Sequence, residues 1–87
     1  MQFIFNLTME MATGAAIRLR WNRSGNSQGT IFIPEASAYL DHDYIILDTT
    51  TKTTIDTTEH NATRATFFRV KAKKNDITSE ASNVVAM

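Results

Sequence analysis

The sequence contains no cysteine, one proline and three glycines among its 87 residues. Without cysteine the chain holds neither a disulfide nor a thiolate metal site, so a fold of this size depends on packing or on its neighbours. No run approaches the roughly 18 apolar residues that a membrane span needs. We therefore predict no disulfide framework and no membrane partner.

An excess of charge of one sign is also missing. Nine basic residues balance nine acidic ones, so there is no broad positive field that would attract a phosphate backbone. We expect no nucleic-acid partner. Near-neutral charge lowers the electrostatic barrier to self-association, which suits a homo-oligomer or a subunit of a larger assembly.

The first fourteen residues, MQFIFNLTMEMATG, lack the basic segment and the continuous apolar stretch of a secretory signal. If Met1 is the natural start, we expect the protein to be made in the cytoplasm without a signal peptide. The composition, 43% hydrophobic and 21% charged, is that of a folded chain. Its length predicts a single domain over residues 1–87.

Strict alternation of apolar and polar residues marks the first two predicted strands. Residues 2–11 carry apolar side chains at the odd positions, and residues 16–21 repeat the pattern with Ile17, Leu19 and Trp21 on one side. A period of two places one face of a strand against a core and the other toward solvent. Both segments are predicted to be half-buried strands.

The middle of the chain is less regular. A strand over 30–33 is expected to end at Pro34, which cannot donate to a strand ladder. Residues 34–43 are predicted to be a loop, holding either a helical turn or an irregular crossover. A buried strand is predicted over 44–47, and the threonine-rich segment 49–66 is predicted to be an exposed or edge strand because branched side chains suit a pleated surface.

Two further strands, over 67–73 and 83–86, bring the predicted number to about seven. No helical period is sustained anywhere in the sequence. Short strands separated by turn formers at spacings of roughly ten residues are typical of sandwiches and barrels. We predict an all-β fold, an antiparallel two-sheet sandwich.

The closing stretch carries the most specific pattern. An aromatic-x-V-x-A segment, Phe68 to Ala72, is followed, after six intervening residues, by S-x-x-S-N at Ser79 to Asn83. This pattern resembles the last two strands of fibronectin type III domains, and residues 16–22 resemble the second strand of that family. The resemblance, strongest at 66–86 and 16–22, implies a fibronectin-III-like or immunoglobulin-like sandwich. Its implied core anchors are Trp21, Phe68, Val70 and Ala72.

The chain departs from that family at several points. Thr66 stands where the family often carries a corner tyrosine, and the expected turn glycine is replaced by Asn75-Asp76 or Ile77. Either Phe32 or Tyr44 takes the place of the central-strand aromatic. The two serines of the hairpin are expected to bond local backbone in the turn, where strand pairing is interrupted.

Residues with catalytic or ligand chemistry are few. Asp41, His42 and Asp43 form one local cluster, to which Glu35 could add an oxygen. Calcium needs six or more oxygens and zinc prefers more nitrogen or sulfur, so we predict no metal site. His60 has no nucleophile motif to serve. We predict no catalytic residues, no cofactor and no enzyme.

Two candidate interaction surfaces emerge instead. Phe3 and Phe5 add apolar surface to a first strand that could pair with the sheet edge of another subunit. Arg69, Lys71 and Lys73 are predicted to form an outward basic stripe, which serves either as a docking surface for an acidic partner or as a defence against edge pairing.

These observations favour a non-enzymatic structural or interaction module with protein partners. By analogy of fold, we expect a small subunit of a larger assembly such as a phage or virus particle, as a decoration, tail or baseplate component incorporated into the virion. The alternative is a carbohydrate-binding or cell-adhesive module that reads its ligand with the loops 22–29 and 34–43.

Overall fold

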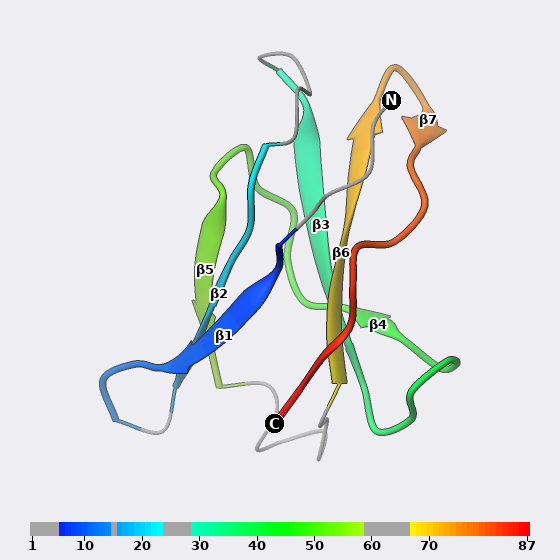
Figure 1. Ribbon diagram of the computed structural model, residues 1–87. Coiled ribbons are helices and arrows are strands. Elements are labelled where there is room, and N and C mark those ends of the chain that lie inside the picture. The colour runs from blue at the N-terminus through cyan, green and yellow to red at the C-terminus, as the bar shows by residue number, and fades with distance from the viewer. Residues whose placement is uncertain (1–5, 15, 24–28, 59–66) are drawn as a thin grey trace.

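A computed structural model describes residues 6–14, 16–23, 29–58 and 67–87. Within these ranges the chain forms strands and no helix, in two antiparallel sheets (Figure 1). The strands are β1 (Thr8–Met11), β2 (Ile17–Arg20), β3 (Ile31–Ser37), β4 (Ile45–Ile46), β5 (Thr54–Thr57), β6 (Phe67–Lys74), β7 (Ile77–Thr78) and β8 (Val85–Ala86). The predicted fold class is confirmed.

Each sheet has a simple order. One contains three strands in the order β1-β2-β5, and the other contains β4-β3-β6-β7, with β8 also paired to β6. The longest ladder joins β3 to β6 through seven residue pairs, from Ile31 opposite Lys73 to Ser37 opposite Phe67. Figure 1 shows this pair of strands side by side as the spine of the larger sheet.

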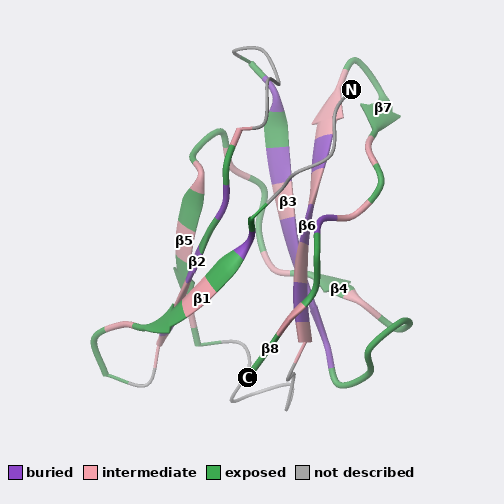
Figure 2. Cartoon of the chain, in the orientation of Figure 1, coloured by how far each residue is buried: buried purple, intermediate pink, exposed green. Residues whose placement is uncertain are grey.

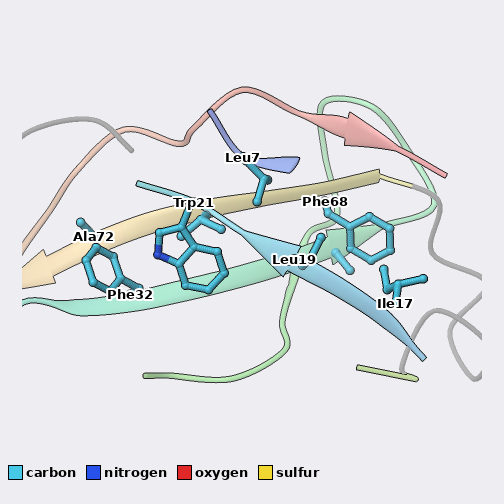
Figure 3. Close-up of a cluster of buried hydrophobic side chains, with 9 residues drawn as sticks. Leu7, Ile17, Leu19, Trp21, Phe32, Phe68 and Ala72 are labelled. Carbon is cyan, nitrogen blue, oxygen red and sulfur yellow. The ribbon is translucent and has the colours of Figure 1, made fainter. Parts of the chain in front are cut away.

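The core lies between the sheets because alternate residues of both point inward. It comprises Leu7, Ile17, Leu19, Trp21, Phe32, Ala36, Phe68, Val70 and Ala72. The Trp21 and Phe32 rings are 6.0 Å apart and tilted by 59°, and Figure 3 shows the indole nitrogen on the side of Phe32. That buried nitrogen has no hydrogen-bond partner in the described part of the chain, so Trp21 stabilises the core by packing.

The strand predicted to end at Pro34 instead continues through it to Ser37. The Pro34 carbonyl accepts a hydrogen bond of 2.8 Å from the Leu47 amide. Because the N and O atoms of one strand residue point to the same side, the Pro34 nitrogen also faces Leu47 and not β6. The missing N–H therefore costs nothing in the β3–β6 ladder, and the predicted end of the strand was wrong.

The neighbouring predictions were wrong for a related reason. Residues 34–37 belong to β3, so the loop is shorter than predicted, and residues 38–42 form bends without a helical turn. The strand predicted to be buried over 44–47 is reduced to β4 and is exposed, with 44% and 61% of Ile45 and Ile46 accessible. The apolar residues of this segment therefore lie at a sheet edge and not in a core strand.

Other predictions agree with the structure, wholly or in part. β5 is an edge strand of the smaller sheet, as the threonine-rich segment predicted. In the predicted first strand, Leu7 is buried and Met9 packs against the core, as the alternation predicted, but the inward position predicted for Met11 is wrong, since this residue at the end of the edge strand β1 is 70% exposed. Residues 2–5 of that prediction lie outside the described residues. No described helix has the length and apolar character to cross a membrane.

Candidate interaction surface

The two edges of the five-stranded sheet differ in how their backbone hydrogen bonds are completed. One edge is the C-terminal arm, residues 77–86, which runs back along β6 as β7, an irregular stretch and β8 (Figure 1). The other is β4, which pairs with β3 through only two residue pairs. The predicted last strand thus corresponds to only part of this arm.

Between β7 and β8 the arm has no regular strand, and two serines make the hydrogen bonds to β6 there. The Ser82 hydroxyl accepts a 2.9 Å bond from the Val70 amide, and the Ser82 amide donates to the Val70 carbonyl at 2.8 Å. Ser79 repeats this arrangement with Ala72, at 2.9 and 2.7 Å. The serines were predicted to bond turn backbone; they also bond Glu80 and Asn83 carbonyls, but their main partners lie on β6.

Asn83 then joins the arm to the other sheet. Its side-chain oxygen accepts a 3.0 Å bond from the Leu7 amide, and its side-chain nitrogen donates to the Leu7 carbonyl at 3.1 Å. A side-chain amide therefore takes the place of a strand residue beside the chain that enters β1. The S-x-x-S-N pattern closes this edge, which we call the closed edge.

The β4 edge, which we call the open edge, has no such completion. Figure 2 shows β4 and the loop before it as exposed. Its exposed large apolar side chains are Tyr39, Leu40, Ile45 and Ile46, at 51%, 59%, 44% and 61%. Isolated apolar residues on a surface need no explanation, but two exposed pairs within eight positions, Tyr39-Leu40 and Ile45-Ile46, place several apolar side chains on one short segment, which is typical of contact sites.

The open edge also presents backbone groups. Because the Leu47 amide bonds the Pro34 carbonyl, the preceding residue, Ile46, must point its own N–H and C=O away from β3. Among the described strands, only β3 pairs with β4. An apolar edge strand with outward N–H and C=O groups is a template for pairing with another strand.

The predicted basic stripe lies on the outer face of this sheet but is partly neutralised. The Arg69 Nε donates to Glu35 Oε1 at 2.7 Å, and the Lys71 Nζ lies 3.8 Å from the same oxygen. The Arg69 guanidinium also stacks 3.8 Å above the Tyr44 ring centroid. Lys73 pairs across strands with Ile31 and Thr78, so this face combines cations with isoleucine and tyrosine.

Glu35 is therefore not a ligand of the 41–43 cluster, as the sequence had suggested, but the buried partner of Arg69. In that cluster, His42 Nδ1 lies 2.7 Å from Asp41 Oδ1. This hydrogen bond raises the pKa of His42 and lowers that of Asp41. The His42 ring stacks on Tyr39 at 4.4 Å, and no group of three or more metal-ligating side chains occurs among the described residues.

The remaining sequence-predicted residues fall into two groups. Trp21, Phe68, Val70 and Ala72 all lie in the core between the sheets. Phe3, Phe5 and His60 lie outside the described residues. Of the two candidates for the central aromatic, Phe32 is fully buried against Trp21, whereas Tyr44 lies on the outer face under Arg69.

Sequence reasoning missed the open edge because Tyr44 to Leu47 was assigned to the interior. One signal could have found it: Asp43 and Asp48 bracket a run of only four apolar residues. A strand so short, with charges at both ends, is more typical of an edge than of a sheet centre.

The outer face of the smaller sheet is polar and charged. Arg18 bonds Asp56 through two nitrogens, at 2.8 and 3.1 Å, and Arg20 Nε lies 3.0 Å from Glu10 Oε1. Beside these pairs is an open depression of about 460 Å³, whose lining includes Asn6, Thr8, Arg20, Asn22, Thr53 and Thr54. It lies next to the start of the predicted 22–29 loop, of which residues 24–28 lie outside the described residues.

Of the comparisons with known proteins, the one with solved structures identifies the fold. No protein-family model matches the sequence, and no curated protein matches it. Among solved structures, a Fn3-like protein from Clostridium thermocellum is similar over 93% of this chain and 84% of its own, with a TM-score of 0.76 and 20% identity.

Two titin structures are also similar. One contains titin kinase and its flanking domains, with a TM-score of 0.69, and the other contains domains A168–A170, with a TM-score of 0.65; both are 16% identical. They match 93% and 95% of this chain, which spans 15% and 30% of theirs. At these identities the likeness shows the fold, a fibronectin-III-like or immunoglobulin-like sandwich.

Proposed function

We propose that this fibronectin-III-like sandwich is a non-enzymatic module that acts through protein contacts, as a subunit of a larger assembly. A fold of this kind suggests a structural or interaction role. The observation that carries the proposal is the open edge, where exposed apolar side chains and outward backbone groups lie on one segment. Chemistry of that kind recognises another protein strand.

A phage or virus particle is the assembly we propose, in which the chain is a decoration, tail or baseplate component. The support is analogy of fold together with the near-neutral charge of the chain. Its experiment is quantitative mass spectrometry of purified particles from the source of the sequence. We expect the chain in a fixed copy number per particle, retained after washing in high salt.

A chain recovered only in fractions of free protein near 9.8 kDa, and absent from particles, would contradict the virion proposal.

A glycan array distinguishes the carbohydrate-binding alternative. That alternative is supported by the exposed Tyr39 ring in the 34–43 segment, since exposed aromatics are suited to stacking. Saturable glycan binding that is lost in Tyr39→Ala would favour this alternative over the assembly role.

A further inference from the structure

We propose that the open edge pairs with the same edge of a second copy of this chain, antiparallel about a twofold axis at Ile46. The two five-stranded sheets would then form one continuous sheet. The inference rests on the proposed function, since it names one of the protein contacts through which the module acts.

The backbone supplies the first step. The Ile46 N–H and C=O point away from β3, because Leu47 on its other side bonds Pro34. In an antiparallel pair centred on Ile46, each copy donates its N–H to the C=O of the other, forming two equivalent hydrogen bonds. This is the self-complementary contact that a twofold axis generates.

The side chains supply the second step. With Ile46 opposite its own copy, Ile45 lies opposite Leu47 of the other, so apolar residues face apolar residues on both sides of the sheet. Ile46 is 61% exposed and Ile45 44% exposed in the single chain, and Leu47 is half-buried. Pairing would remove this exposed apolar area from water, which is favourable in proportion to its size.

Charge favours an antiparallel second copy. Asp41 and Asp43 precede β4, whereas Asp48 and Lys52, whose charges cancel, follow it. Parallel pairing places the Asp41 and Asp43 segments of the two copies side by side, whereas antiparallel pairing separates these segments and sets each Asp48 opposite Tyr44 of the other copy. The chain as a whole is neutral, so no long-range repulsion opposes the contact.

The other edges are less suited to such pairing. β1 carries Glu10 and β5 carries Asp56, both in ion pairs, and charges on edge strands oppose pairing. The closed edge is completed by Ser79 and Ser82. Pairing at the open edge alone consumes that edge in both copies, so the assembly stops at a dimer.

The test is sedimentation equilibrium of the full chain from micromolar to millimolar concentration. The wild type should move from 9.8 kDa toward twice that mass. Ile46→Lys should weaken association more than about tenfold, because it places two like charges face to face. Ile46→Pro should do the same, because it removes the outward N–H while leaving the bonds to β3.

The matched control is Ile77→Lys. Ile77 is 62% exposed on β7, against 61% for Ile46 on β4, and both lie in two-residue edge strands of the same sheet. The control should associate like the wild type. Unchanged urea unfolding of all three variants would show that they remain folded.

A wild type that stays monomeric at millimolar concentration would overturn the pairing, as would Ile46 variants that associate normally or an Ile77 variant that does not. These outcomes are separable from the proposed function. A monomeric chain that is nevertheless present in fixed copy number in purified particles would overturn the dimer and leave the assembly role intact. A chain that dimerises but is absent from particles would support the pairing and contradict the virion role.

Discussion

The two edges of the five-stranded sheet both end in short strands, and both expose an isoleucine to about the same extent, yet their hydrogen bonds are completed differently. At the closed edge, Ser79 and Ser82 bond β6 with their side chains, and Asn83 bonds Leu7 of the other sheet. At the open edge, Ile46 points its backbone groups outward. The difference between the edges lies in the polar side chains of the arm, which complete the hydrogen bonds at one edge, and not in the length of the edge strands.

Truncating a core side chain that is shared by both edges should have the largest effect on stability. Phe68 is fully buried and pairs with Ala36 on one side and Val85 on the other. Phe68→Ala should lower the free energy of unfolding by about 3–5 kcal/mol, measured by urea denaturation. The exposed Ile77→Ala should change it by less than about 0.5 kcal/mol, and equal losses in the two variants would contradict the assigned core.

The closed edge can be opened by one hydroxyl. Ser82→Ala leaves the Val70 amide without its buried partner and should cost about 1–3 kcal/mol, again by urea denaturation. Ser79→Ala should cost less, because Ser79 is half-buried and water can reach the Ala72 amide. If the two substitutions were equally silent, the serines would not be what completes this edge.

Each edge also has an aspartate in the left-handed backbone region, which allows a matched stabilising change. Asp76 has a φ of 67° in the β6–β7 turn, and Asp43 has a φ of 57° before β4. Glycine adopts such angles without steric cost. Asp76→Gly should raise the melting temperature slightly, because the relief of about 1–2 kcal/mol of left-handed strain exceeds the extra backbone entropy that glycine loses on folding, about 0.5–1 kcal/mol. Asp43→Gly should gain less, because it also removes the charge 3.9 Å from His42. A fall in stability for Asp76→Gly would contradict the turn geometry.

The smallest expected effect is a pH dependence at the open edge. The hydrogen bond to Asp41 raises the pKa of His42 above 6.5. The folded state therefore binds this proton more tightly than the unfolded state, so the contribution to stability is present below pH 6.5 and is lost as pH rises through the folded pKa.

Nuclear magnetic resonance titration of the His42 ring measures this directly. Asp41→Asn should lower the pKa of His42 toward its ordinary value, and Asp43→Asn should lower it less, because Asp43 lies farther away. A His42 that titrates alike in wild type and Asp41→Asn would show that the hydrogen bond does not form in solution.

Much of the fold was predictable from local pattern. The alternation at Ile17, Leu19 and Trp21 and the pattern from Phe68 to Ala72 fix inward faces, because side chains on a strand alternate regardless of its partners. The edge position of the threonine-rich segment followed from its residue types. These predictions concern single strands and their faces.

The errors concern pairing, which depends on residues far apart in sequence. Whether Pro34 ends a strand depends on which neighbour its nitrogen faces, and that is settled by Leu47 and β6 together. Whether Ile45 and Ile46 are buried depends on the sheet order, since the same apolar letters suit a central strand or an edge. The roles of Ser82 and Asn83 likewise depend on Val70 and Leu7, which periodicity does not identify.

One edge of the five-stranded sheet is closed and the other is open, and amide hydrogen exchange at Val70 and Ile46 tests this difference most directly. In dilute protein, the Val70 amide should be strongly protected and the Ile46 amide should exchange rapidly. As the concentration rises to the millimolar range, Ile46 should become protected while Val70 stays unchanged. Rapid exchange at Val70, or a strongly protected Ile46 amide in dilute protein, would contradict this difference between the edges, and exchange at Ile46 that does not change with concentration would contradict the pairing of two copies.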